Sequence, residues 1–325
     1  MKHVAVVMGG YSAEQLISMK SGEIAMKHLQ SNVLKPYAVI IDKQGWHLQL
    51  NGQEYPINKS DFSAQIGVEK ITFDAVFMAI HGTPGEDGEL QAYLDELNIP
   101  YTTSGAKAAA LSFNKGKCNN FLRDKGILCA PSYLITKGEA MNEADILKRV
   151  GLPCFVKPNK NGSSFGISKV TQADALSTAI NKAFEHDEEV LIESFMEGTE
   201  VTCGAINFGG ELRTLPATEI VSENDFFDFE AKYEGKSKEI TPARLSAAVA
   251  HKVAEQTKRI YTLLKLDGIA RIDFIIQKGE PYIIEANTVP GLSEESIIPQ
   301  QAACAGISLA ELFTQAVAHA LQEEL

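Results

Sequence analysis

The sequence lacks the features that mark membrane-spanning, nucleic-acid-binding and disulfide-stabilised proteins. None of its apolar runs approaches the roughly 20 residues of a membrane-spanning helix. Acidic residues outnumber basic ones by 42 to 30, and no stripe of clustered Lys and Arg offsets the net charge of −12, which argues against a nucleic-acid surface. The N-terminal apolar stretch is too short, and ends too soon in glycine, for a signal peptide, so we expect it to form a first strand.

Cysteine is also scarce. The five cysteines are scattered, odd in number and without paired spacing, which is typical of neither a zinc site nor a disulfide framework. We therefore expect reduced thiols in a cytoplasmic protein. The composition is otherwise ordinary for a globular chain, with 45% hydrophobic and 22% charged residues, and the length of 325 residues predicts two or three domains.

The first hundred residues alternate predicted strands with predicted helices, which indicates an α/β domain with a parallel sheet. Two motifs follow apolar strands there: Gly-Gly-Tyr-Ser-Ala-Glu at residues 9–14 and His-Gly-Thr-Pro-Gly-Glu-Asp-Gly at residues 81–88. Ligands of such sheets bind at the carboxyl ends of strands, so both motifs are candidate sites. Glu14 also has a structural interpretation, as the acidic partner of a helix dipole with a cap near Ser12, and His81 alone is unremarkable in a turn.

Residues 157–166, Lys-Pro-Asn-Lys-Asn-Gly-Ser-Ser-Phe-Gly, form a predicted strand–loop–strand. The segment is neither a Walker A loop nor a dinucleotide-binding Gly-x-Gly-x-x-Gly loop. Its small residues nevertheless let backbone amides approach phosphate oxygens, and Lys157 adds a positive charge. Such a flap would cover a nucleotide and exclude water; the alternative is an ordinary surface hairpin.

Residues 268–290 contain two β-branched runs around a short Gly-containing loop, which predicts a hairpin. If the loop spans residues 278–280, four polar side chains share one face of the hairpin: Asp273 opposite Glu285, and Arg271 opposite Asn287. Opposed carboxylates repel unless a cation lies between them, and with a carboxamide they offer the hard oxygen donors that suit Mg²⁺. The alternative is a surface hairpin with a solvated polar face. The other face is predicted to join the core: Ile272, Phe274, Ile276, Tyr282, Ile284 and Ala286.

The remaining segments give weaker signals. Two strands are predicted at residues 189–194 and 199–208, with an apolar break flanked by acidic residues between them. The break could bind an adenine through backbone groups and a ribose through a carboxylate; the alternative is an ordinary β-turn. The aromatic, charged residues 225–233 are typical of an active-site cover or of a loop anchored by phenylalanines. A further strand and two helices are predicted at residues 212–221, 242–264 and 309–321.

Together these segments resemble the ATP-grasp superfamily and, within it, the D-alanine–D-alanine ligases, over nearly the whole chain. The resemblance rests on motifs in this order: residues 9–14, residues 81–88, Lys157-Pro158 with residues 162–166, Glu-Ala-Lys-Tyr at 230–233, Arg-Ile-Asp at 271–273, and Glu-Ala-Asn-Thr at 285–288 before Pro290-Gly291. Each motif alone is weak, but their order and spacing together are specific.

The resemblance implies an ATP-grasp fold, mixing α/β and α+β structure, in three parts. These are an N-terminal α/β domain with a parallel sheet on the first-substrate side at residues 1–103, a central subdomain with the phosphate-covering flap at residues 104–188, and a C-terminal subdomain with the metal site at residues 189–325. ATP would lie between the last two, together with two Mg²⁺ (or Mn²⁺).

The resemblance also implies site residues. The metal ligands would be Asp273, Glu285 and Asn287. ATP would be bound by Lys115, Lys157, Ser164, Glu193, Ser194, Met196, Glu200 and Lys232, with Ile275 under the adenine. The first substrate would be held by Glu14 and His81, with Glu14 hydrogen-bonded to Ser163 and Tyr233. The oxyanion donors would be Arg271 and the backbone N–H of Gly291, and Ser296 would lie at the second substrate's carboxylate.

The implied reaction joins two D-alanines through an acyl phosphate, giving the D-alanyl-D-alanine used to build peptidoglycan. The alternatives are D-lactate or D-serine as the second substrate, and a non-catalytic ATP-binding protein of the same fold. Tyr233 favours the dipeptide, because ligases that use D-lactate tend to have phenylalanine there. The chain departs from the family pattern at Asn114, where aspartate is frequent, at Leu16-Ile17-Ser18, and at Val289 and Glu294-Glu295 near the second-substrate pocket. Small-molecule substrates and a homodimer are expected, without nucleic acid or membrane.

Overall fold

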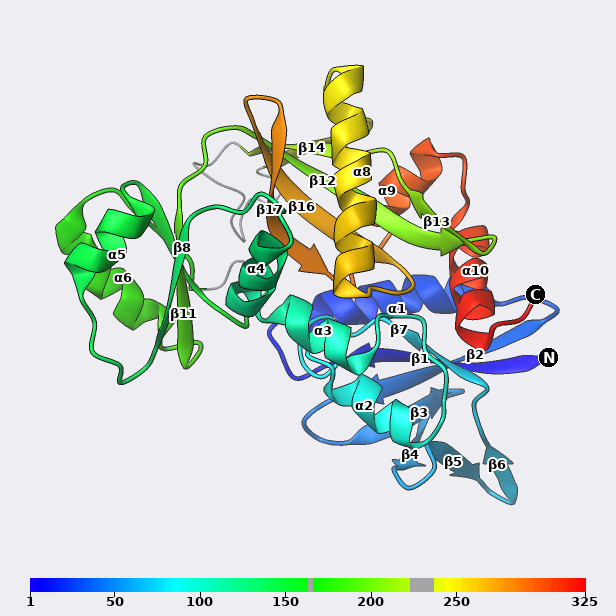
Figure 1. Ribbon diagram of the computed structural model, residues 1–325. Helices are drawn as coiled ribbons and strands as arrows, with labels where there is room; N and C mark the ends of the chain where they lie inside the picture. Colours follow the sequence, from blue (N-terminus) through cyan, green and yellow to red (C-terminus); the bar gives the residue numbers. More distant parts are fainter. Residues whose placement is uncertain (163–165, 223–236) are drawn as a thin grey trace.

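The computed structural model describes residues 1–162, 166–222 and 237–325 (Figure 1). Four predicted site residues lie outside this part of the chain: Ser163, Ser164, Lys232 and Tyr233. The described chain forms three sheets, and its two ends lie at the same side of the molecule, where the side chains of Lys2 and Glu323 form an ion pair of 2.8 Å.

The N-terminal sheet has seven strands in the order β6-β5-β4-β3-β2-β1-β7. Its strands are β1 (Lys2–Gly9), β2 (Leu34–Ile41), β3 (Trp46–Leu50), β4 (Gln53–Asn58), β5 (Ser63–Ile66), β6 (Glu69–Ile71) and β7 (Ala75–Met78). Only β1, β2 and β7 pair in parallel, and hairpins extend the sheet with antiparallel strands. The predicted parallel sheet is therefore confirmed for β2, β1 and β7 alone, which lie together at one end of the sheet.

Helices cover both faces of the N-terminal sheet. The first face packs on α1 (Gln15–Leu29) and on the last helix, α10 (Leu309–Leu321), and the second face packs on α2 (Glu89–Glu96). Successive side chains of β1 point alternately into these two cores, because neighbouring residues of a strand face opposite sides of the sheet. The predicted cap of α1 is wrong: the helix begins at Gln15, and the Ser12 hydroxyl instead accepts the backbone N–H of Glu14 and donates to the His81 carbonyl.

The central sheet forms a separate lobe, seen at the left of Figure 1. Its four antiparallel strands run in the order β10-β9-β11-β8: β8 (Ser132–Thr136), β9 (Cys154–Pro158), β10 (Ser168–Val170) and β11 (Glu189–Ser194). One face packs on α5 (Glu143–Val150) and α6 (Leu176–Ala183), the latter preceded by the turn η1 (Ala173–Ala175). Because β11 completes this sheet, we propose that the central subdomain ends after Ser194 rather than at residue 188.

The C-terminal sheet has six strands in the order β15-β14-β12-β16-β17, with β13 pairing on β12. The strands are β12 (Thr199–Phe208), β13 (Glu211–Thr214), β14 (Thr218–Ser222), β15 (Ser237–Ile240), β16 (Ala270–Gln277) and β17 (Glu280–Asn287). The core face packs on α8 (Ala247–Leu264) and on two helices from earlier in the chain, α3 (Ala106–Phe113) and α4 (Lys115–Asp124). The predicted strand at 212–221 is wrong as one element, since Leu215-Pro216-Ala217 separates β13 from β14.

The last two helices tie this sheet to the N-terminal one. The sequence analysis missed α9 (Ile297–Cys304), which is held by the fully buried Gln301. The Gln301 amide donates to the Thr202 carbonyl at 2.9 Å and accepts the Gly204 N–H at 2.9 Å, both on β12. The predicted helix at 242–264 begins at Ala247, where the Ser246 hydroxyl caps it. In the described residues no single helix is long and apolar enough to cross a membrane; α9 and α10 reach that length only together, across a 104° bend.

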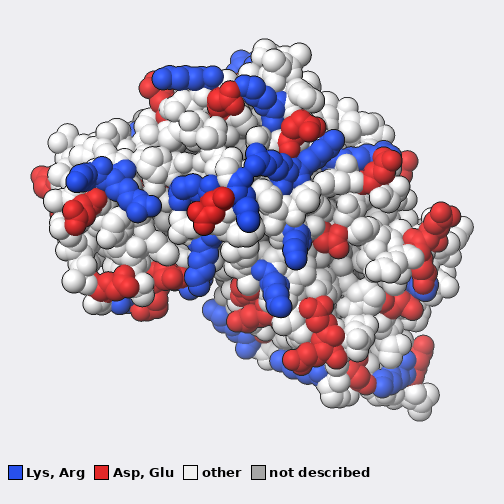
Figure 2. Space-filling model, in the orientation of Figure 1, with Lys and Arg blue, Asp and Glu red and all other residues white. Residues whose placement is uncertain are grey.

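Charge is unevenly spread over the surface. Figure 2 shows Lys and Arg side chains gathered over the middle of one face, around α4 and α8, with acidic side chains mostly toward the edges. Although the net charge of the protein is negative, cationic side chains lie near the place where the central lobe meets the other two sheets.

Candidate active site

Two cavities adjoin where the three sheets meet. The first, of about 540 Å³, lies between the central and C-terminal sheets. The second, of about 660 Å³, lies between the start of α1, the C-terminal sheet and the loop at residues 288–296. Four residues line both cavities: Lys115, Asn161, Gly162 and Glu285. A group at this shared border is within reach of a ligand in either cavity.

The first cavity has one apolar wall on the C-terminal sheet. Ile275 lies there as predicted, together with Tyr282 and Ile284, which the sequence analysis wrongly assigned to the core. The cause is a β-bulge in the β16–β17 hairpin: Asp273 pairs with Glu285, but Phe274 pairs with Ile283, which leaves Ile284 as the extra residue. The bulge turns Tyr282 toward the cavity and puts Ile283 in the core instead.

The hairpin has a shorter loop than predicted. Lys278 and Gly279 both have positive φ, 53° and 78°, and form a two-residue turn that pairs Gln277 with Glu280 rather than with Pro281. The shorter loop and the bulge compensate each other. The predicted opposition of Asp273 to Glu285, and of Arg271 to Asn287, is therefore confirmed although the loop and part of the predicted core face were wrong.

Lys157 lies deep in the first cavity. Its side chain comes from β9, is about as buried as Glu193 of β11, and forms an ion pair with that carboxylate. Glu193 also accepts the Asn119 amide at 2.8 Å. A buried ammonium needs such a partner, because an unpaired charge is poorly solvated there. Four other residues predicted to bind ATP also line this cavity: Lys115, Ser194, Met196 and Glu200.

Lys115 marks the border between the cavities. It is the first residue of α4, and its ammonium donates to the Asn161 carbonyl at 2.9 Å and lies 3.4 Å from a Glu285 oxygen. The side chain thus connects the residues before the predicted flap to the predicted metal-binding hairpin.

Asp273 is surrounded by donors. The Arg271 guanidinium donates to both its oxygens at 2.8 Å, the Asn287 amide donates at 3.0 Å, and the Thr202 hydroxyl donates as well. The positive charge expected between the opposed carboxylates therefore comes from Arg271 on Asp273 and from Lys115 on Glu285. No three His, Cys, Asp or Glu side chains converge on a metal site within the described residues; the predicted set contains two acids and an amide.

The second cavity collects the other predicted residues. Glu14, His81, Arg271, Gly291 and Ser296 line it, and Glu14 occupies the position just before α1. The segment before the flap comes close here as well: a Cβ on Gly162 would lie only 2.4 Å from a Glu14 carboxylate oxygen. On the other side, a Cβ on Gly291 would lie 2.8 Å from the Ser296 hydroxyl. The chain is thus packed tightly against two of the predicted site residues.

His81 is held on both ring nitrogens by the protein. Its Nδ1 donates to the Val289 carbonyl at 2.7 Å, and its Nε2 lies 3.0 Å from the Ser21 hydroxyl, which also accepts the Leu292 N–H. Burial lowers the pKa of His81, which favours the neutral ring. This arrangement holds the loop that carries Gly291 in place, and substrate contact by His81 stays a prediction.

Glu86 is a site residue that the sequence analysis missed. Its carboxyl accepts the Gly82 N–H at 2.8 Å and the Val289 N–H at 3.3 Å, and it lines the second cavity. Burial, with a smaller contribution from the charge of Glu14, raises the pKa of Glu86 to about 8. The sequence feature that could have identified Glu86 is its place in a glycine-rich turn directly after a buried strand.

Two family models match the chain, D-ala D-ala ligase N-terminus at residues 3–104 and D-ala D-ala ligase C-terminus at residues 121–318. Among curated relatives, the D-alanine–D-alanine ligase of Flavobacterium johnsoniae is 52% identical over 98% of both chains, and that of Christiangramia forsetii is 48% identical over 99% of both.

Solved structures agree in fold. The D-alanyl-alanine synthetase A of Vibrio cholerae has a TM-score of 0.89 at 27% identity, over 99% of both chains. The D-Ala:D-Ser ligase of Enterococcus faecalis has a TM-score of 0.86 at 29% identity, over 98% of both. The D-alanine–D-alanine ligase of Bacillus anthracis complexed with ATP has a TM-score of 0.80 at 29% identity, over 99% of this chain and 98% of the other. By sequence over its full length and by fold, this chain belongs to the D-alanine–D-alanine ligase family.

Proposed function

We propose that the protein joins two D-alanines into D-alanyl-D-alanine, using ATP, for peptidoglycan synthesis. The observation that carries this proposal is the pair of cavities that share Lys115 and Glu285 at their border. A nucleotide in the first cavity would have its terminal phosphate at that border, where a carboxylate substrate in the second cavity could meet it. In the proposed reaction the carboxylate of the first D-alanine takes the γ-phosphoryl group of ATP, giving an acyl phosphate and ADP. The amine of the second D-alanine then attacks the acyl carbon, and phosphate leaves as the amine loses a proton.

ATP would occupy the first cavity. Its adenine would lie against the apolar wall of Ile275, Tyr282 and Ile284 and next to the segment at residues 193–196, with Glu200 toward the ribose. Its phosphates would approach Lys157 and Lys115, because lysine ammonium groups neutralise the charge that phosphoryl transfer redistributes.

The residues at the hairpin fit Mg²⁺. Asp273 and Glu285 are directly opposed, and Asn287 lies beside them, so the set offers carboxylate and amide oxygens, although the Asn287 amide must first turn its oxygen inward. When bound there, Mg²⁺ would neutralise negative charge on the ATP phosphates. Arg271 and Lys115 neutralise the same carboxylates in the structure, so we expect both cations to move toward substrate when metal binds.

The first D-alanine would bind in the second cavity with its ammonium on Glu14, leaving its carboxylate toward the border. Arg271, once released from Asp273, and the Gly291 N–H would stabilise the oxyanion of the tetrahedral intermediate. Ser296 would hold the second substrate's carboxylate. The contact of Gly162 with Glu14 suggests that first-substrate binding and flap position are linked, which would help exclude water from the acyl phosphate.

A D-serine or D-lactate ligase remains the second candidate, since a D-Ala:D-Ser ligase is among the similar structures. Glu294 and Glu295, which the sequence analysis noted near the second-substrate pocket, line the second cavity close to Ser296. Their negative charge would disfavour a second substrate whose carboxylate lies close to them.

The test is phosphate release from Mg·ATP with D-alanine, with L-alanine, and with D-alanine plus D-lactate or D-serine, followed by mass analysis of the product. D-alanine-dependent release with a dipeptide product is expected. No release with any D-amino acid, in a protein that binds ATP, would refute the proposal and favour a binding protein. A cytoplasmic location and a homodimer stay predictions.

A further inference from the structure

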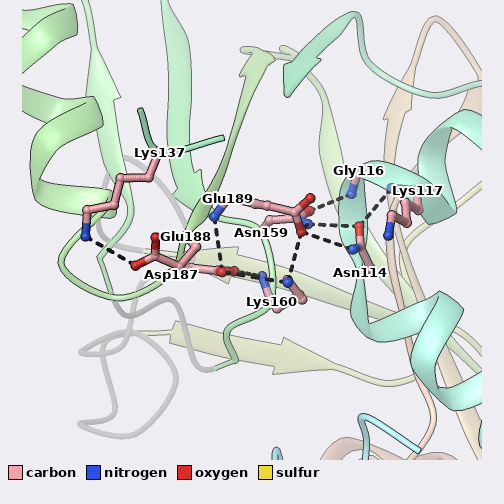
Figure 3. Close-up of polar contacts among 9 residues, drawn as sticks. All are labelled: Asn114, Gly116, Lys117, Lys137, Asn159, Lys160, Asp187, Glu188 and Glu189. Carbon is pink, nitrogen blue, oxygen red and sulfur yellow. Dashed lines mark hydrogen bonds and ion pairs between the residues drawn. The ribbon is translucent and has the colours of Figure 1, made fainter. Parts of the chain in front are cut away.

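A largely buried polar cluster of Asn114, Asn159 and Glu189, drawn in Figure 3, lies outside both cavities. Two of its members are close in sequence to the proposed phosphate-binding residues Lys115 and Lys157. Asn159 is fully buried, and Asn114 is 6% exposed. The Asn159 amide nitrogen donates to the Asn114 side-chain oxygen at 2.8 Å and to a Glu189 oxygen at 3.1 Å. The Asn114 amide nitrogen donates to the same Glu189 oxygen at 3.3 Å. The three side chains thus form a closed ring of hydrogen bonds that joins α4, β9 and β11.

The cluster holds the start of α4. The Asn114 side-chain oxygen accepts the Lys117 N–H at 3.0 Å, and the Asn159 side-chain oxygen accepts the Gly116 N–H at 2.7 Å. The Asn159 carbonyl accepts the Lys115 N–H at 3.4 Å. The first N–H groups of a helix have no partner within the helix, and here two asparagines supply those partners. The position of Lys115 therefore depends on residues of β9.

The same cluster is anchored from outside. The Lys160 ammonium lies 3.0 Å from the Glu189 oxygen that accepts both asparagines. Asp187 accepts the backbone N–H of Lys160 at 2.6 Å and that of Glu189 at 3.2 Å. Figure 3 shows these contacts as one continuous chain that ends at α4. Residues 159–161 are thereby held at both ends, because the Lys115 ammonium donates to the Asn161 carbonyl.

The position of the cluster in the chain gives it a use. Asn114 directly precedes Lys115, and Asn159 follows Lys157 by two residues. We propose that Asn114, Asn159 and Glu189 are positioning residues, which fix the separation of Lys115 and Lys157 and hold residues 160–162 at the border of the two cavities. This inference rests on the proposed binding of ATP phosphates by the two lysines.

The chemistry requires an amide at position 114. Its side chain accepts from Lys117 through one atom and donates to Glu189 through another, which an amide can do and an ionised carboxylate cannot. In Asn114→Asp, a carboxylate oxygen would face the Glu189 carboxylate at the 3.3 Å contact. Two adjacent carboxylates repel, so the start of α4 would shift or one acid would take up a proton.

The experiment measures kcat and KM for ATP in the whole chain and in variants of the cluster. Asn114→Asp is expected to lower kcat/KM for ATP about tenfold, the effect of losing a contact of this strength. Glu189→Gln alone is expected to cause a smaller loss, because its amide oxygen still accepts both asparagines at the position of the shared carboxylate oxygen and only the charge paired with Lys160 is removed. The double variant N114D/E189Q removes the repulsion between the two carboxylates and lets the glutamine amide donate to the new carboxylate at position 114, at the cost of the Asn159 contact to the same atom, so it is expected to recover part of the loss.

The matched control lies on the same turn. Lys137 and Glu188 form an ion pair of 3.3 Å next to Asp187 and Glu189, but their side chains are 51% and 75% exposed. Glu188→Gln is expected to leave both kinetic constants unchanged. Asn114→Ser keeps a cap for α4 and loses the amide that donates to Glu189, without adding a second carboxylate, so a milder loss is expected.

Thermal unfolding separates positioning from a purely structural role. Variants that unfold at lower temperature but keep kcat/KM within about twofold of the wild type would overturn the inference, since a contact that matters only for stability shifts unfolding alone. Failure of the double variant to exceed Asn114→Asp would also overturn it. In a Lys115→Met background Asn114→Asp is expected to have little further effect. If Lys115→Met itself leaves kcat/KM unchanged, the proposed role of Lys115 fails instead, and that result is distinguishable from failure of the cluster.

Discussion

Replacing Lys157 by methionine separates what the buried ion pair does for folding from what the lysine does for ATP. Lys157 and Glu193 are each 7% exposed, and among the described residues the carboxylate keeps only the Asn119 amide when the ammonium is removed. Removing one partner of a buried pair destabilises a protein by roughly 3–5 kcal/mol, because the other charge stays buried without a partner. The remaining Asn119 hydrogen bond places the expected loss near the lower end, about 3 kcal/mol.

A second variant makes this reasoning refutable. Lys157→Met with Glu193→Gln removes both charges and keeps an acceptor for Asn119, so it is expected to recover most of the lost stability but none of the ATP affinity. Urea unfolding gives the stability, and titration with ATP gives the affinity. If the free energy of unfolding of Lys157→Met falls by less than about 1 kcal/mol, the ion pair is solvated like an exposed pair, and the expected cost of an unpaired buried carboxylate is refuted. If the double variant regains ATP binding, Lys157 does not contact the nucleotide.

Three further predictions follow from the second cavity and the hairpin. The pKa of Glu86 is raised to about 8 in the folded protein. Between the ordinary pKa of a glutamate and about pH 8, the folded state therefore holds a proton that the unfolded state has lost. The free energy of unfolding is expected to fall as the pH rises through that window. Unfolding of Glu86→Gln at several pH values should therefore show a flatter decline than the wild type; parallel curves would contradict it. Glu14→Gln should raise KM for the first D-alanine roughly 10- to 100-fold, as expected for a lost charge-assisted hydrogen bond, while ATP affinity measured by titration stays unchanged. Glu285→Gln should raise the Mg²⁺ concentration for half-maximal activity about tenfold, because one anionic ligand is lost; an unchanged Mg²⁺ titration would exclude Glu285 as a ligand.

The local sequence predicted the hairpin at residues 268–290 only in part. Its β-branched runs and alternation predicted the strands and put Asp273 opposite Glu285. The two-residue turn needed a lysine at positive φ, which sequence statistics disfavour, and the bulge at Ile284 leaves no local signal. The wall of the first cavity was therefore incompletely predicted.

Helix α9 shows a different limit. Its sequence, Ile-Ile-Pro-Gln-Gln-Ala-Ala-Cys, is short and contains a proline that is easily taken as a helix breaker. Pro299 lies in the first turn, where its missing N–H has no intrahelical partner to lose. What fixes the helix is Gln301 on the backbone of β12, nearly a hundred residues away.

The sequence by itself determined the family, the order of strands and helices around the motifs, and the set of chemically competent residues, because these depend on residue identity and on near neighbours. Only the tertiary structure decided which charges neutralise which. Lys115 pairs with Glu285, and His81 and Glu86 both bind Val289, across segments far apart in the sequence. Arg271 and Asp273 lie two residues apart on β16, but the sequence did not show that they pair with each other. The physical basis of these contacts is the low polarity of a packed interior, where each buried charge or amide must find a partner that only the folded arrangement supplies.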